Sequence, residues 1–253
     1  MTENTQQNNP ENSQVSVLSH LRELRRRLKV AVIVYVIGVM VLMNFSDAVF
    51  DFMSEPLRAA LPEGQPLIFL NAPDVFFTYL KIALVLSLFA TAPITFYQLW
   101  AFVAPGLYQH EKRVFLSYFI ASVGLLLAGG AFAFYVVFPL IFEFFLGFST
   151  DTIQAMPAVK EYLSLALKLL FAFGLSFQIP IIVLILVRLG FVEVAGLTAK
   201  RRYVIVWAFI FAAILTPPDI ISQALLALPM MLLYELGIML ARIERKPEVQ
   251  QAE

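Results

Sequence analysis

The chain has 253 residues, of which 60% are hydrophobic and only 14% are charged, and its 18 basic residues balance its 18 acidic ones. Soluble domains are about one quarter charged, so this chain must place much of its surface against lipid, and its zero net charge argues against nucleic acid as a partner. The absence of cysteine excludes disulfides, iron–sulfur clusters and thiol catalysis, and two distant histidines, His20 and His110, argue against an imidazole metal site.

The amino-terminal part of the chain is predicted to change from a polar tail into an interfacial helix. Residues 1–17 are rich in Asn, Gln and Glu without periodicity, which is typical of a disordered cytoplasmic tail. Leu18–Lys29 places leucines on one helical face and charges elsewhere, so we expect it to lie along the membrane surface before the chain enters the membrane. Asn44–Asp51 offers no convincing signal-peptide cleavage site, so the first apolar stretch should be retained.

Six apolar stretches predict an all-α membrane protein with six transmembrane helices in one domain, residues 18–242, followed by a cytoplasmic tail, residues 243–253. A spanning helix needs about 20 residues, and the fifth stretch is too short to reach that length comfortably. Pro93, Pro180 and Pro229 fall inside the second, fourth and sixth stretches and should kink or interrupt them, which favours a concave bundle. The stretches are Val30–Phe45, Phe76–Phe102, Val114–Phe138, Tyr162–Val187, Tyr203–Leu215 and Ile220–Leu240.

The distribution of basic residues predicts the orientation of the chain. With the amino terminus inside, all but four of the 18 Lys and Arg residues fall on the inner side, and six spans then place the carboxyl terminus inside as well. The outer loops Ser46–Val75 and Pro139–Glu161 carry prolines and carboxylates and are expected to form ordered caps. The four exceptions are Arg58, Lys81, Lys160 and Lys168.

No catalytic motif is present, so we expect neither an enzyme nor a cofactor. The sequence lacks H-E-x-x-H and a phosphate-binding glycine loop, and Gly174–Gln178 (GLSFQ) lacks the second glycine of G-x-S-x-G. These absences exclude ATPase and protease chemistry.

Two acidic residues near the inner surface each allow two interpretations. Glu23, in HLRELRRRL, can pair with Arg26 or Arg27 on its own helix, or its carboxylate can accept a ligand's guanidinium bidentately. Glu111 is either a solvated loop acid beside basic neighbours or the second half of a site for a cationic peptide. Around it, Trp100, Phe102 and Tyr108 are expected to mark the interfacial aromatic belt.

Other polar residues interrupt the apolar stretches. A buried amide at Gln178 requires hydrogen-bond partners, whereas Lys81 and Lys168 are expected to snorkel outward. A small secondary transporter with a polar site at Gln178 and Lys168 is the alternative function, although no inverted repeat is visible. Gly129 and Ala133 either allow close approach of a neighbouring helix or are merely small residues in lipid.

The turn between the fifth and sixth stretches gathers further polar residues. Asp219 can cap the start of the last helix. Thr216 and Gln223 are expected to face the membrane, where polar groups suggest docking of another transmembrane segment.

Taken together, these segments resemble the TatC family, the multispanning component of the twin-arginine translocase, from Ser19 to Arg242. The motifs that carry the resemblance are HLRELRRRL, SEPL, LWAFVAPGLYQHEKR, FAFYVVFPL, FAFGLSFQIP and LTPPDIISQALLALPM, in that order. The resemblance implies a glove-like bundle of six helices with both termini cytoplasmic. It also implies that the bundle receives the signal peptides of folded export substrates at a bacterial-type inner membrane.

The resemblance also implies roles for single residues. Glu23 and Glu111 match the acids that bind the paired arginines, with Arg25 and Phe102 supporting that surface. It implies single-span partners of the TatA or TatB type, docked at Thr216, Gln223 and Gln178, and self-association within a larger complex. Many relatives carry glutamate where this chain has Gln178, so a proton relay there is disfavoured. Pro56, Phe134 and Asp219 also fall on motif positions, and Pro56 and Asp219 are expected to shape the outer caps.

Overall fold

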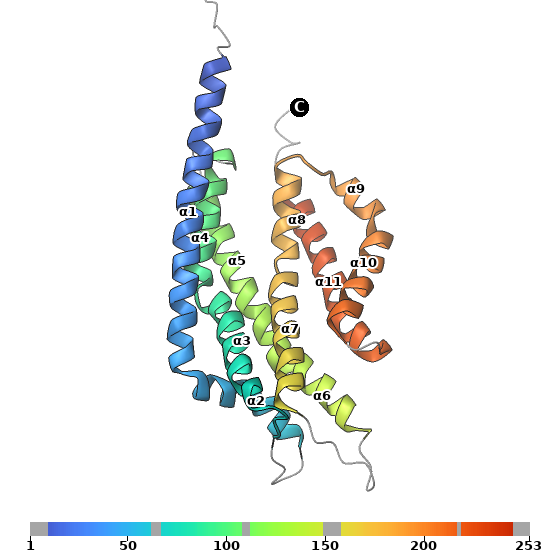
Figure 1. Cartoon of the computed structure of the whole chain (residues 1–253). Coiled ribbons are helices and arrows are strands. Elements are labelled where there is room, and N and C mark those ends of the chain that lie inside the picture. Colours follow the sequence, from blue (N-terminus) through green and yellow to red (C-terminus); the bar gives the residue numbers. More distant parts are fainter. Residues whose placement is uncertain (1–9, 62–66, 108–111, 149–157, 217–218, 245–253) are drawn as a thin grey trace, which may run out of the picture.

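The computed structural model describes residues 10–61, 67–107, 112–148, 158–216 and 219–244, and these are almost entirely helical (Figure 1). The helices run between two ends of an elongated molecule. Their bounds are α1 Pro10–Asn44, α2 Ser46–Ala60, α3 Ala72–Ala90, α4 Ala92–Leu107, α5 Lys112–Phe132, the π-helix η1 Ala133–Val137, α6 Phe138–Leu146, α7 Val159–Ser176, α8 Ile179–Arg188, α9 Val194–Ala199, α10 Arg201–Leu215 and α11 Ile220–Glu244.

Helix α1 is continuous from the polar amino-terminal region into the first apolar stretch. Its 35 residues correspond to about 52 Å, which exceeds the hydrocarbon core of about 30 Å. The prediction that Leu18–Lys29 lies along the membrane surface is therefore wrong, because no glycine or proline between Leu18 and Ile37 ends the helix. The predicted tail is helical from Pro10 onward, and residues 1–9 lie outside the described residues.

Two of the three predicted proline interruptions are confirmed. Pro93 and Pro180 each occupy the second position of a new helix, α4 and α8. A backbone N–H at that position has no acceptor within the helix, so the N–H that proline lacks costs no hydrogen bond. Pro229 does not interrupt α11, which continues from Ile220 to Glu244 around it.

The third apolar stretch continues past its predicted end at Phe138 to Leu146. The backbone N–H of Phe138 donates to the carbonyl of Ala133, a five-residue spacing that widens the turn into a π-helix. Pro139 follows at once and lacks a donor, and the widened turn accommodates it without ending the helix. The outer loop expected to start at Pro139 is correspondingly shorter.

Among the described residues, five helical segments are long and apolar enough to cross a membrane. Helix α10 has 15 residues, about 22 Å, and falls short, as the sequence predicted for the fifth stretch. The start of α1 and the end of α11 lie at the same end of the molecule (Figure 1). The five segments are Leu21–Asn44, Ala72–Ala90, Leu116–Leu146, Val159–Arg188 and Ile220–Ile243.

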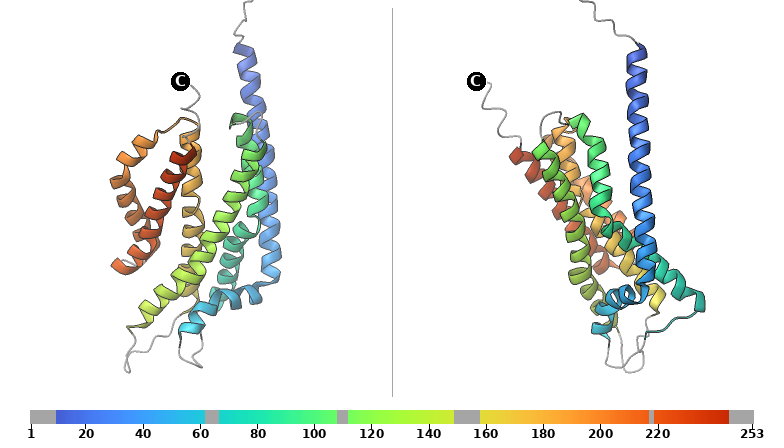
Figure 2. Two further views of the ribbon diagram at one scale, coloured as in Figure 1. Left: turned by 180° about the vertical axis from the view of Figure 1, so that it is seen from behind. Right: turned by 90° about the vertical axis from the view of Figure 1, so that its left-hand side faces the viewer.

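Helices α5 and α7 form the centre of the bundle. Figure 2 shows them between a group containing α1, α3 and α4 and a group containing α8, α10 and α11. A Cβ atom on Gly129 would lie 2.5 Å from the carbonyl oxygen of Phe173, so the two backbones are in direct contact. Gly129 and Ala133 are both buried, which confirms close helix approach over the lipid-facing alternative.

The opposite end, made of α2, residues 67–71 and the first turns of α3 and α7, is named the cap end. There Lys160 Nζ lies 2.9 Å from Asp74 Oδ1, and the Val159 N–H donates to the Ile68 carbonyl at 2.8 Å. The Tyr162 hydroxyl donates to the carbonyl of Met53 at 3.2 Å. These bonds join α2, α3 and α7, so the described part of the first cap is ordered as predicted, and residues 62–66 of that cap lie outside the described residues.

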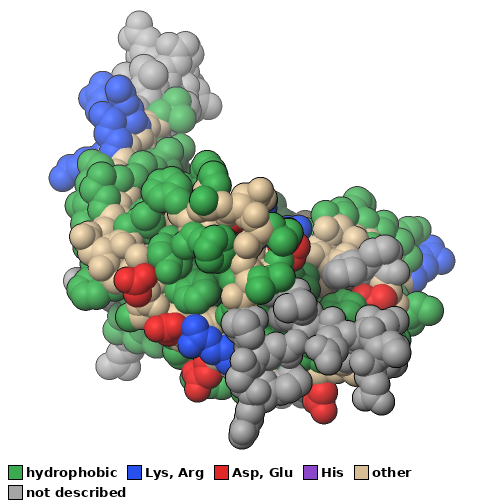
Figure 3. Space-filling model, turned by 60° about the horizontal axis from the view of Figure 1, so that its bottom comes forward, with side chains coloured by type: hydrophobic (Ala, Val, Ile, Leu, Met, Phe, Trp, Pro, Cys, Tyr) green, Lys and Arg blue, Asp and Glu red, His purple; other side chains and the backbone are tan. Residues whose placement is uncertain are grey.

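Acidic and basic side chains are interspersed with large apolar surfaces at the cap end (Figure 3). Pro56 lies half-buried within α2, and Phe52 of the same helix stacks on Phe134 with ring centroids 4.5 Å apart. This stacking fixes α2 against η1. Residues 149–157 of the second predicted cap lie outside the described residues.

Candidate functional site

The carboxylate of Glu23 lies on the amino-terminal half of α1 within a basic sequence. Its Oε1 accepts hydrogen bonds from Arg27 Nη2 at 2.6 Å and Nε at 2.9 Å, so of the two predicted intrahelical partners Arg27 is the actual one. The Glu23 side chain is 39% exposed, and its Oε2 accepts no hydrogen bond from the described residues. The second oxygen is therefore available to an external donor.

The other residues predicted to support this surface lie on α1 and α4. Arg25 is exposed on α1, and Phe102 is half-buried on α4, which packs along α1. Glu111 and Tyr108 lie outside the described residues, between the last residue of α4, Leu107, and the first of α5, Lys112. The structure thus brings Glu23, Arg25 and Phe102 onto two adjacent helices.

A polar and aromatic network fixes α4 beneath Phe102. The indole Nε1 of Trp100 donates to Ser122 Oγ at 3.0 Å, and its ring stacks on Tyr118 at 5.5 Å. Trp100 is only 5% exposed, so the prediction that it belongs to the lipid-facing aromatic belt is wrong. Its N–H finds a partner inside the protein instead of at the membrane interface.

The same network extends to α8. Gln178 is buried, and its Nε2 donates to the Ser122 carbonyl at 3.0 Å, which confirms that the amide needs an internal partner. Arg188 Nη1 donates to the Tyr118 hydroxyl at 2.7 Å, with its guanidinium over the Tyr118 ring. Sequence reasoning missed Ser122, Tyr118 and Arg188, because their pairing depends on tertiary contacts among α4, α5 and α8.

The hairpin between α10 and α11 separates its polar residues into different environments. Asp219 Oδ1 accepts the N–H of Ser222 at 2.6 Å, which confirms the predicted cap of α11. Thr216 is buried and donates to the Ala212 carbonyl at 2.9 Å, so the expectation that it faces the membrane is wrong. Gln223 is half-buried, and its side-chain amide bonds to no described residue.

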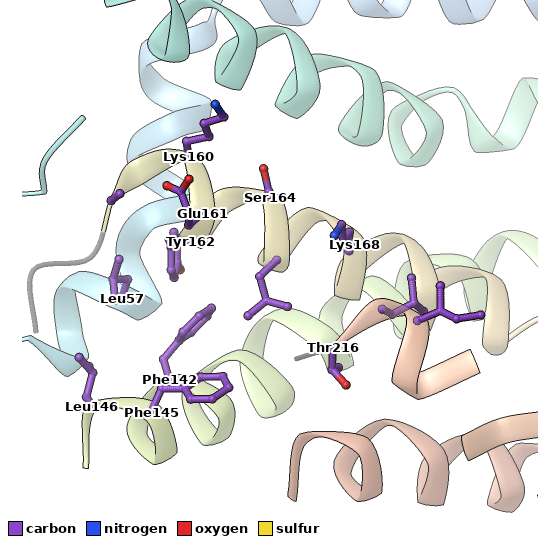
Figure 4. Close-up of a pocket in the computed structure, with 14 residues that line it drawn as sticks. Leu57, Phe142, Phe145, Leu146, Lys160, Glu161, Tyr162, Ser164, Lys168 and Thr216 are labelled. Atoms are coloured by element: carbon purple, nitrogen blue, oxygen red, sulfur yellow. The ribbon is translucent and has the colours of Figure 1, made fainter. Parts of the chain in front are cut away.

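A cavity of about 690 Å³ opens near the cap end between α6, α7 and α10 (Figure 4). Its lining is mainly apolar, with Phe142, Phe145 and Leu215 contributing, and Thr216 at one side. Lys168 lines the same cavity from α7. Lys168 and Gln178 are ten residues apart, which corresponds to about 15 Å along the helical path. Gln178 bonds to Ser122 and Lys168 lines the cavity, so the two residues do not form the single polar site that the transporter alternative needs.

Metal binding finds no support in the described ranges. In these parts of the chain no group of three histidine or acidic side chains is close enough to hold an ion. Some of the charged groups there form ion pairs, such as Arg201 Nη2 with Glu235 Oε2 at 2.6 Å between α10 and α11.

The comparisons with known proteins agree with one another. Residues 19–229 match the family model described as Sec-independent protein translocase protein (TatC). The protein of that name from Magnetococcus marinus is 44% identical over 93% of this chain and 88% of its own length, and that from Escherichia coli K12 is 38% identical over 89% and 88%. A crystal structure of the twin-arginine translocase receptor TatC superposes with a TM-score of 0.80 at 38% identity, covering 88% of this chain and 98% of that chain.

Several apolar helices long enough to span a bilayer, together with matches to protein translocase components, define a multi-pass membrane protein of protein transport. The chain belongs to the TatC family. It is therefore a component of the Sec-independent, twin-arginine protein translocase in the bacterial inner membrane, working together with other subunits of that complex and not as an enzyme.

Proposed function

We propose that this chain is the receptor of its translocase and that Glu23 and Glu111 together bind the paired arginines of a signal peptide. The observation that carries the proposal is the half-engaged carboxylate of Glu23, with one oxygen bonded to Arg27 and the other available. Two adjacent guanidinium groups require two carboxylates, because each planar guanidinium matches one carboxylate bidentately. Arg25, on the same helix as Glu23, and Phe102, on the adjacent helix α4, are proposed to support the same surface.

The orientation that this proposal needs follows from the basic residues. Placing the start of α1 in the cytoplasm puts Arg22, Arg25 and Arg26 on the inner side, in accord with the positive-inside rule, and puts the cap end outside. Both termini and the peptide site then lie in the cytoplasm, where a folded substrate first meets the membrane.

A comparison of two peptides tests the receptor function. The purified chain is expected to bind a signal peptide with Arg-Arg at least about 10-fold more tightly than the same peptide with Lys-Lys, because lysine presents a point charge instead of a bidentate fork. Fluorescence anisotropy of labelled peptides at physiological salt measures both affinities. Equal affinities for the two peptides would contradict recognition of paired guanidinium groups.

A second part of the proposal concerns single-span subunits of the TatA or TatB type, which dock on the α10–α11 hairpin beside other copies of this chain. Trp207 and Ile214 of α10 and Ile220 of α11 are 68%, 72% and 85% exposed, which leaves a wide apolar surface on the hairpin itself. Gln223 supplies an unbonded amide at its edge, and such amides hydrogen-bond between transmembrane helices. Thr216 is buried at the end of α10 and is proposed to shape the hairpin, whereas Gln178 is buried against Ser122 of α5 and can act on partner docking only indirectly.

Gln223→Leu is expected to weaken co-purification of the single-span partner several-fold, since loss of an interhelical hydrogen bond is worth about 0.6–2 kcal/mol. Peptide affinity should not change, because the hairpin lies far from α1. Gln98→Leu, the same exchange at a half-buried residue of α4, serves as the control for co-purification. If partner and peptide binding fall together in Gln223→Leu, the two sites are not separate.

A further inference from the structure

A groove of about 310 Å³ between α3 and α7 carries two lysines on an otherwise apolar surface. Lys81 and Lys168 lie on opposite helices, and both side chains are exposed. Ser164, Lys168 and Phe171 follow one another along α7 at helical spacing and form one wall. Lys160, Ser164 and Lys168 are labelled along this helix in Figure 4. The groove thus combines positive charge with an apolar floor.

Neither lysine forms an ion pair with a described residue. In the described ranges no carboxylate lies within ion-pair distance of Lys81 or Lys168, and Lys81 Nζ contacts only Ser164 Oγ, at 3.3 Å. The neighbouring acid of α3, Asp74, is engaged by Lys160. A charged residue in a membrane helix is rare and is normally paired, so these two ammonium groups call for an external anion.

The depth of the lysines places that anion near one membrane boundary. Helices α7 and α8 span 30 residues, roughly 45 Å, so roughly 15 Å lies outside a hydrocarbon core of about 30 Å. Lys81 and Lys168 each follow the start of their helix by nine residues, about 14 Å from the cap end. If the roughly 15 Å of helix outside the hydrocarbon core is divided equally between the two ends, each lysine Cα lies only about 6–7 Å below the membrane boundary. Each ammonium can then reach the headgroup region by snorkelling.

The apolar part of the groove continues away from the cap end. Leu84, Val85 and Phe171 lie about one turn deeper than the lysines, and Leu84 and Phe171 are 38% and 42% exposed. We propose that this groove binds one anionic phospholipid, its phosphate between Lys81, Lys168 and the Ser164 hydroxyl and an acyl chain along the deeper apolar surface. A lipid matches both features of the groove at once, charge near the boundary and hydrocarbon below it.

Native mass spectrometry of the full chain in mild detergent tests the proposal with phosphatidylglycerol and phosphatidylcholine of equal acyl chains. The wild type should retain one phosphatidylglycerol preferentially, and Lys81→Gln/Lys168→Gln should weaken its binding about 30-fold, from the contribution of two basic residues. Lys81→Arg/Lys168→Arg should retain it, and Lys200→Gln, at an exposed lysine outside the groove, should not change it.

Unchanged phosphatidylglycerol binding in the double glutamine variant would overturn the proposal. The proposal would also be overturned if the double glutamine variant lost the single-span partner but still preferred phosphatidylglycerol. That result would mean that the two lysines pair with a carboxylate of the partner. Should the double variant fail to fold, Phe171→Trp keeps both lysines and gives an independent reading. With the native Trp100 and Trp207 replaced by Phe, its fluorescence should be quenched more by phosphatidylglycerol with brominated acyl chains than by brominated phosphatidylcholine, and equal quenching would reject the site.

Discussion

Gly129→Ala should destabilise the protein by about 1–3 kcal/mol, although it adds a single methyl group. That methyl would lie 2.5 Å from the Phe173 carbonyl oxygen and 3.0 Å from the Gly174 Cα, both backbone atoms that cannot rotate away. Helices α5 and α7 must therefore move apart along the centre of the bundle. The separation loosens the packing of Phe173, which is fully buried.

Gly124→Ala provides the matched control for this prediction. Gly124 lies on the same helix, and its added Cβ would meet no heavy atom within 4 Å. Alanine favours helix over glycine by up to about 1 kcal/mol, so this variant should be as stable as the wild type or more stable. Thermal unfolding of both variants in one detergent measures the difference, and a Gly129→Ala protein as stable as Gly124→Ala would contradict the close contact.

Local chain chemistry made much of the fold predictable. Pro93 and Pro180 each mark the start of a new helix because a proline lacks a backbone donor, which is a local property. Pro56 and Pro229 lie inside continuous helices, so this local property does not decide every case. Asp219 caps α11 through an equally local hydrogen bond. The sequence predicts that the helix ends at Phe138, but the helix continues past Pro139 because a π-turn precedes it, where Phe134 stacks on Phe52 of α2.

The predictions that were wrong or left two alternatives concern residues whose environment is set by contacts between helices or at a helix end. Trp100 was assigned to the lipid interface by residue type, but Ser122, 22 residues later, offers its indole a buried partner. Thr216 was expected to face lipid, but the helix end below it supplies the Ala212 carbonyl. Gly129 could not be judged from its own helix, because the contact that requires glycine is made by α7.

The peptide site itself is open to a direct test of its two acids. Glu23→Ala and Glu111→Ala should each weaken binding of an Arg-Arg signal peptide at least about 10-fold, because removing a hydrogen-bonded charge partner costs about 1.5–3 kcal/mol. Glu55→Ala removes an exposed acid of α2 at the cap end and should leave the affinity unchanged. Wild-type affinity in both of the first two variants would remove the proposed site.

Arg27 allows the role of Glu23 to be separated from a general effect of charge. Its guanidinium competes with the peptide for the Glu23 carboxylate, and an intrahelical pair of this kind is worth about 0.2–0.5 kcal/mol. Arg27→Gln should therefore leave peptide affinity equal or raise it up to about twofold, and in the Glu23→Ala background it should do nothing further. A general attraction of acids for a cationic peptide would give the same gain from Arg27→Gln in both backgrounds, so affinities of the four proteins, measured together, distinguish direct binding by Glu23 from a net-charge effect.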